Sequence, residues 1–153
     1  MKIAARILSV LVLGALTVFY TSCSKDDPKG KSETDEQIEK LNGTWVVTDA
    51  KFEGGTPTLD HTNMKLTLSG TAGSKDITYT VENRPSGPSA WPSSGTFTFG
   101  TNAAQDLVRN DDVPVNYSVN GNTLQLEFTF NKAPYNARVE NVSGRWAFTL
   151  TKQ

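Results

Sequence analysis

The chain has one cysteine and one histidine among its 153 residues. Cys23 therefore has no partner within the chain, and no internal disulfide can stabilise a fold. Zinc sites in proteins use at least three Cys, His or carboxylate ligands, and His61 alone cannot supply the nitrogen ligands of such a site. We expect no metal and no cofactor, and a fold that depends on apolar burial.

The chain also lacks an excess of either charge, with 15 Lys+Arg against 16 Asp+Glu. Removal of residues 1–22 takes away Lys2 and Arg6, which leaves 13 basic against 16 acidic residues. A protein of this balance has no basic stripe for a phosphate backbone, so we expect no nucleic-acid partner. The remaining length suits one domain.

Groups suited to catalysis are scarce. His61 follows Asp60 in a polar segment, but a hydrolytic triad also needs a nucleophile brought to both, and we predict an exposed loop histidine. Asp111 and Asp112 lack the spacing of a calcium loop and are predicted to lie in a turn. Other acidic residues are predicted in loops or facing outward, namely Glu53, Asp60, Glu82, Glu127 and Glu140. We predict that the protein is not an enzyme.

What the chain does have is a hydrophobic leader. Lys2 and Arg6 precede an apolar run over 7–20, and two small residues follow before Cys23. This order is typical of a secretory signal, predicted over 1–22. The run is shorter than the ~20 residues of a membrane span. The alternatives are an ordinary cleaved leader that leaves a free thiol, and a membrane-spanning helix.

The residues around the cysteine resemble those of bacterial lipoproteins. Residues 21–23 (TSC) are similar to the end of a lipobox, and the following Lys25, Asp26 and Asp27 resemble the export tag of Bacteroidetes-type surface lipoproteins. The resemblance implies acylation at Cys23, anchoring to the outer membrane through lipid, and exposure at the cell surface. Three acyl chains would make such an anchor stable.

The segment after the leader is polar. Residues 23–36 carry no large apolar side chain beyond the cysteine, and such segments do not bury enough to order themselves. We predict a flexible stalk over 23–36 and a domain over 37–153. A helical turn over 35–41 is predicted at the start of the domain, with Ile38 and Leu41 facing inward.

Apolar residues then alternate with polar ones along most of the chain. Such alternation is typical of half-buried antiparallel strands, and it is clear over 64–69, 77–82, 96–100, 113–119, 124–130 and 146–151. Two less regular strands, 44–52 and 106–110, bring the number to eight. Pro114 is predicted to mark an edge strand or a bulge.

Short turns join these strands. Residues 120–122 (NGN) are a tight-turn signal, and 70–74 and 110–112 have similar turn compositions. No segment has the length of a crossover helix, so a parallel sheet is not expected. An all-β, eight-stranded antiparallel up-and-down barrel is favoured; the alternative is a two-sheet β-sandwich.

The first strand adds a second resemblance. Residues 43–45 (GTW) are similar to the Gly-x-Trp motif of lipocalin-like domains, in which a short helical turn precedes the motif. The resemblance implies a lipocalin-like barrel, and a basic residue from near the last strand placed over Trp45, either Arg145 or Arg138. The resemblance covers the start of the domain closely and the rest by strand count, and small lipocalin-like lipoproteins of unknown function are the proteins that the chain resembles most in this respect.

Two long loops carry candidate ligand-binding residues. The Pro/Ser-rich loop 83–94 contains Trp91, whose face suits a sugar ring or an apolar ligand; the alternative is that Trp91 plugs the barrel. Loop 131–143 contains Tyr135 and Arg138, which are common recognition residues; the alternative is a plain surface loop. In an up-and-down barrel these loops share one end with loop 53–63, and the interior is expected to be mostly packed.

Together these patterns predict a membrane-anchored surface lipoprotein that binds a small apolar molecule or a glycan without catalysis. The alternative is a structural or interaction protein, such as an adhesin, an assembly subunit or an inhibitor. Such a protein would bind another protein through loops or through an exposed strand edge.

Overall fold

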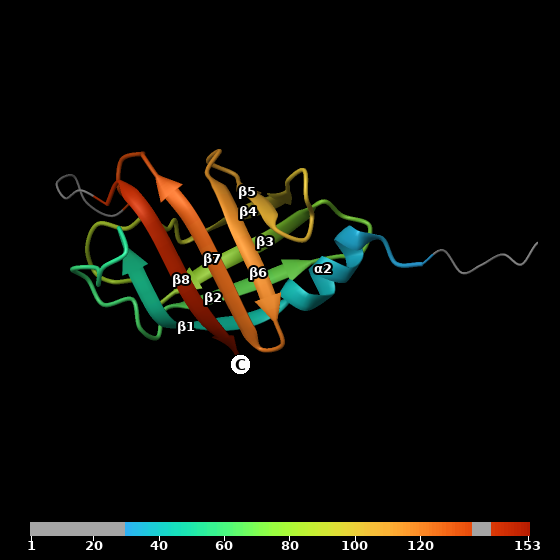
Figure 1. Ribbon diagram of the computed structural model, residues 1–153, viewed down its shortest axis with the longest axis horizontal. Coiled ribbons are helices and arrows are strands. Elements are labelled where there is room, and N and C mark those ends of the chain that lie inside the picture. The colour runs from blue at the N-terminus through green and yellow to red at the C-terminus, as the bar shows by residue number, and fades with distance from the viewer. Residues whose placement is uncertain (1–29, 136–141) are drawn as a thin grey trace, which may run out of the picture. The chain divides into compact units, whose positions relative to one another are not determined.

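The computed structural model describes residues 30–135 and 142–153. These residues contain one helix, α2 (Glu33–Leu41), and eight strands (Figure 1). The strands are β1 (Gly43–Phe52), β2 (Lys65–Gly70), β3 (Asp76–Glu82), β4 (Ser94–Phe99), β5 (Asp106–Arg109), β6 (Pro114–Asn120), β7 (Thr123–Phe130) and β8 (Gly144–Lys152).

The strands form a closed antiparallel barrel in sequence order. Each strand pairs with the next along the chain, and β8 returns to pair with β1 from Trp45 opposite Lys152 to Phe52 opposite Trp146. The predicted up-and-down barrel is therefore confirmed, and the sandwich alternative is wrong.

The period-two pattern explains the core. Along β7 every second residue is buried, and the buried set is Leu124, Leu126, Phe128 and Phe130. Pro114, predicted at an edge or a bulge, is instead the first residue of β6, which pairs with both β5 and β7. The first residue of a strand is a position where proline's missing N–H is tolerated.

Helix α2 seals one end of the barrel. Its N-terminus is capped by Ser32, whose Oγ accepts a hydrogen bond from the Asp35 N–H at 3.1 Å. Ile38 and Leu41 are buried as predicted, and the Trp45 Nε1–H donates to the Leu41 carbonyl at 2.7 Å. With its cap and acidic first turn, the helix begins at Glu33, two residues before the predicted helical turn and within the predicted stalk.

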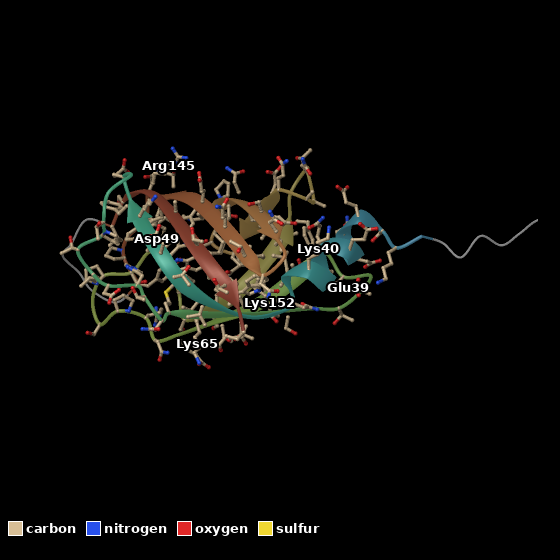
Figure 2. The ribbon with its side chains drawn as sticks, turned by 60° about the horizontal axis from the view of Figure 1, so that its bottom comes forward. Glu39, Lys40, Asp49, Lys65, Arg145 and Lys152 are labelled. Atoms are coloured by element: carbon tan, nitrogen blue, oxygen red, sulfur yellow. The ribbon has the colours of Figure 1, made fainter. Side chains whose placement is uncertain are left out.

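The basic residue over Trp45 is Lys152. Its Nζ lies 5.0 Å from the ring centroid and donates to the Lys40 carbonyl at 3.1 Å (Figure 2). Gly43 makes room, because a Cβ there would lie 2.9 Å from the Lys152 Cε. The expectation of Arg145 is wrong, since Arg145 lies on the outer face and pairs with Glu127. The other expected residue, Arg138, lies outside the described residues.

Four loops meet at the opposite end, called here the loop end. They are 53–64, 83–93, 110–113 and the described parts of 131–143. The Tyr135 N–H donates to the Ser89 carbonyl at 3.1 Å, and the rings of His61 and Trp146 lie 5.1 Å apart. The predicted convergence of the three long loops at one end is confirmed.

Candidate functional site

Trp91 does not stand out from its loop but inserts into the barrel. It is 1% exposed, and its carbonyl accepts hydrogen bonds from Arg84 Nη1 at 2.8 Å and Ser89 Oγ at 3.1 Å. These bonds fold the Pro/Ser loop back on itself and direct the indole inward. The prediction of an indole presented to solvent is wrong, and the alternative, a plug, describes its position.

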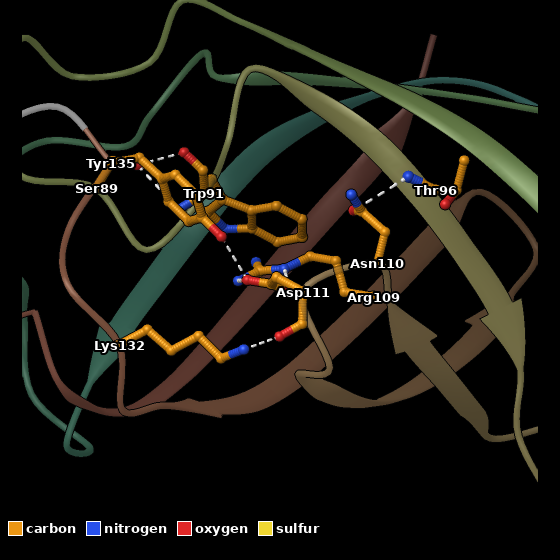
Figure 3. A network of polar contacts seen from close by, with 8 residues as sticks. All are labelled: Ser89, Trp91, Thr96, Arg109, Asn110, Asp111, Lys132 and Tyr135. Carbon is orange, nitrogen blue, oxygen red and sulfur yellow. Dashed lines mark hydrogen bonds and ion pairs between the residues drawn. The ribbon is translucent and has the colours of Figure 1, made fainter.

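Arg109, at the end of β5, lies beside the indole inside the barrel and is fully buried. Its Nε and Nη2 donate to the two carboxylate oxygens of Asp111, each at 2.8 Å (Figure 3). Its Cζ lies 5.3 Å from the Trp91 centroid and 5.2 Å from that of Phe128, within the range of a cation–π interaction. Buried arginine is tolerated only when paired in this way.

Arg109 was not among the predicted site residues, although the strand pattern contained a signal for it. Leu107 and Arg109 occupy alternate positions of a predicted strand, and Leu107 is an inward core residue. The same alternation therefore directs Arg109 inward. Asp111, expected only as a turn residue, follows at the distance that lets its side chain reach back to the guanidinium.

Tyr135 completes this polar cluster. Its hydroxyl donates to the Asp111 carboxylate, and Lys132 Nζ donates to the Asp111 carbonyl (Figure 3). Burial raises the pKa of Asp111, but the hydrogen bonds from Arg109 and Tyr135 outweigh burial and bring that pKa down to about 2. Burial and the bond to Asp111 raise the pKa of Tyr135 to about 12. The cluster therefore consists of the ionised pair Arg109–Asp111 and the neutral phenol of Tyr135.

Three buried polar atoms around the indole have no hydrogen-bond partner among the described residues. They are the Tyr79 hydroxyl, Trp91 Nε1 and Arg109 Nη1. Burial raises the pKa of Tyr79, so the phenol stays protonated at neutral pH. All three can donate a hydrogen bond, and an unmet buried donor costs about 1–3 kcal/mol. The Tyr79 ring and the Arg109 Cζ lie 6.1 and 5.3 Å from the indole centroid, so unmet donors around this ring suit a ligand that carries acceptors.

His61, predicted to be exposed, is instead 3% exposed. Its ring lies 5.1 Å from that of Trp146 and 5.6 Å from that of Phe148, and its Nδ1 lies 2.8 Å from the Leu59 carbonyl oxygen. Asp60 accepts from the Thr62 N–H at 2.8 Å, a local turn that directs the histidine inward. Burial lowers the pKa of His61, which favours the neutral ring.

A small apolar pocket of about 50 Å³ opens beside His61 at the loop end. It lies between loops 53–64 and 83–93, and its lining includes Phe52, Leu59, Pro88 and Trp146. Two larger hollows of about 310 and 350 Å³ lie on the outer face beside the Arg145–Glu127 ion pair. Both members of that pair are well exposed, and such pairs contribute little energy.

Among residues 30–135 and 142–153, no cluster of His, Cys, Asp and Glu has the arrangement of a metal site. No helix in that part of the chain is long and apolar enough to cross a membrane. The predicted lipid-attachment and export residues, Cys23, Lys25, Asp26 and Asp27, lie outside the described residues, as does Arg138.

The structure therefore brings Trp91 and Tyr135 together at the loop end, and adds Arg109, Asp111 and Tyr79 to them. Trp91 faces the interior of the barrel, whereas Tyr135, which is 40% exposed, contributes to the outer surface. No protein-family model matches the chain, and no curated protein matches it.

Proposed function

We propose that this protein is a lipid-anchored, non-catalytic binding protein that takes a small apolar molecule at the loop end of its barrel. The observation that carries the binding function is the apolar pocket between loops 53–64 and 83–93. Ligand sites in proteins are commonly concave, mostly apolar and formed where loops meet at the mouth of a barrel. Such sites have volumes of roughly 300–1,000 Å³, so loops 53–64 and 83–93 must move apart to enlarge this pocket of about 50 Å³ when a ligand enters.

An apolar ligand is better supported than a glycan. Sugar recognition depended on an indole face open to solvent, and Trp91 is buried. The rings that border the pocket, Phe52 and Trp146, lie 4.8 Å apart and present apolar surface next to a neutral His61. A molecule that enters the pocket therefore gains apolar contact and meets no charged lining residue.

Native mass spectrometry of the protein, extracted gently from its own membranes, tests the binding function directly. A co-purifying small molecule is expected to be reduced by Leu59→Ser, because Leu59 lines the pocket. Val108→Ser is the matched control, since Val108 is 38% exposed and lies on β5. Equal amounts of the compound in both variants would contradict a site at this pocket.

The membrane anchor is supported by the lipobox-like tripeptide and by the position of Cys23 directly after the leader. We expect Cys23→Ala to release the protein from the membrane fraction. Replacing both Asp26 and Asp27 with alanine is the matched comparison, because it keeps the acylated cysteine and is expected to reduce only protease accessibility on intact cells. Retention of the Cys23→Ala protein in membranes would contradict acylation.

A protein partner remains the second candidate, on one observation. Tyr135 is 40% exposed and its hydroxyl is held by Asp111, and an ordered exposed tyrosine is typical of recognition surfaces. Recognition through a free strand edge is not supported, because each described strand is paired on both sides. If loop 131–143 binds a protein, Tyr135→Ala reduces co-purification of that protein and Val108→Ala does not.

A further inference from the structure

The space filled by Trp91 has the properties of a ligand site that the chain's own indole occupies. We propose that a flat aromatic molecule with a neutral hydrogen-bond acceptor binds in this space and displaces the indole. The inference rests on the binding function proposed above, and it names the site within the barrel and the chemical class of the ligand.

The shape of the space suits one flat ring system. Four aromatic rings stand at 74–86° to the indole, with centroids 5.2–6.4 Å from it. They come from β3, β4, β7 and β8, and are Tyr79, Phe97, Phe128 and Phe148. Edge-to-face geometry of this kind is favourable for aromatic rings in general, so it does not require an indole.

The polarity of the space suits the indole poorly. Trp91 Nε1 can only donate a hydrogen bond, and it has no acceptor among the described residues. The wall of the barrel itself supplies two of the unmet donors, Arg109 Nη1 and the Tyr79 hydroxyl. A ligand with an acceptor could satisfy these wall groups, which the indole leaves unmet.

Charge indicates that this acceptor is neutral. The guanidinium of Arg109 is already neutralised by both carboxylate oxygens of Asp111. An anionic ligand would add an uncompensated charge in a buried space, which is costly. A carbonyl oxygen can accept from Arg109 Nη1 or from the Tyr79 hydroxyl without adding charge.

The loop that carries Trp91 can leave the barrel with most of its own structure intact. The hydrogen bonds of the Trp91 backbone are made within the loop, to Arg84 and Ser89. The Ser89 carbonyl links the loop to Tyr135 of the neighbouring loop. Asn83, at the start of the loop, also donates from Nδ2 to the Asn63 carbonyl at 3.3 Å. Breaking the Ser89–Tyr135 link and withdrawing the indole would open the space that Trp91 fills.

Equilibrium binding of two matched probes tests whether the space filled by Trp91 prefers a ligand with a hydrogen-bond acceptor. In a Trp91→Leu variant, which removes the indole but keeps an apolar side chain, 2-acetylnaphthalene is expected to bind about threefold to tenfold tighter than naphthalene, the range of one net hydrogen bond. Adding Tyr79→Phe is expected to reduce this preference and to leave naphthalene binding unchanged. If neither probe binds Trp91→Leu, or if both bind equally, the site is refuted.

Fluorine NMR of the full-length protein tests displacement. Incorporation of 5-fluorotryptophan labels Trp45, Trp91 and Trp146, the three tryptophans of the chain, and Trp91→Phe assigns the resonance of Trp91. With 2-acetylnaphthalene, the Trp91 signal is expected to gain the H₂O/D₂O isotope shift of an exposed indole. Trp45, at the sealed end, is expected to stay unchanged.

The same spectra separate this inference from the proposed function. Trp146 lines the small apolar pocket, so a probe that binds only there shifts Trp146 and leaves Trp91 buried. That result would overturn displacement and support the proposed function. A shift of Trp91 together with loss of the acceptor preference in Tyr79→Phe supports the inference.

Discussion

Replacing Trp91 with alanine tests whether the buried indole stabilises the barrel. Truncation of a buried tryptophan typically costs about 3–5 kcal/mol, and loss of the contact with Arg109 adds about 0.5–2 kcal/mol. Removal of the unmet Nε1–H recovers about 1–3 kcal/mol. These contributions together span about 0.5–6 kcal/mol, and we expect Trp91→Ala to lower the free energy of unfolding by the midpoint, about 3 kcal/mol.

Urea unfolding monitored by circular dichroism measures this change, provided that the slope m stays constant. For a domain of this size, the loss corresponds to a fall in melting temperature of roughly 10 °C. Val108→Ala, on the outer face, is the control and should change stability by less than about 0.5 kcal/mol. A loss for Trp91→Ala no larger than that of the Val108→Ala control would refute the plug, because truncation of a packed indole leaves a cavity that destabilises the fold.

The cluster around Asp111 yields further predictions. The pKa of Asp111 is lowered to about 2, so its ionised form stabilises the fold above the unfolded-state pKa of about 4, and this stabilisation is lost as the pH falls toward 2. In an acid titration the wild type should lose about 2 kcal/mol more stability than Asp111→Asn over that range. Equal losses would contradict the ion pair. Arg109→Met alone should cost about 3–5 kcal/mol, and Arg109→Met with Asp111→Asn clearly less, because the single change leaves an unpaired carboxylate. Gly95→Ala should destabilise the barrel, since its Cβ would lie 2.3 Å from Asn110 Oδ1 and 2.6 Å from the Tyr79 hydroxyl; unchanged unfolding would show that these groups move aside.

Much of the fold could be predicted from the sequence because strands leave a local signal. The alternation in β7 and the turn at Gly121 were sufficient to place a hairpin. Residues 33 and 34, which precede the predicted helical turn, were missed because their polar composition resembles a stalk, although the Ser32 cap that starts the helix is a short-range signal. Closure of the barrel depends on the long-range pairing of β1 with β8, which has no local signal in the sequence. The number of strands and their short turns favoured a barrel over a sandwich but did not establish it.

The site was less predictable, for two different reasons. Arg109 and Lys152 could have been found, since each lies on the buried face of its strand; in β8 this is the face that carries Trp146, Phe148 and Leu150. The inward positions of Trp91 and His61 could not, because the direction of a long loop side chain depends on packing against strands distant in sequence.

The pairing of β1 with β8 also determines when the barrel can close during synthesis. Thr48 and Thr149 are hydrogen-bonded across the seam although they are 101 positions apart in the chain. A growing polypeptide emerges N-terminus first, so its earliest strand must wait for the last one before the ring can shut. The barrel can therefore close only after β8 has been synthesised, and removal of Gly144–Lys152 would open the seam.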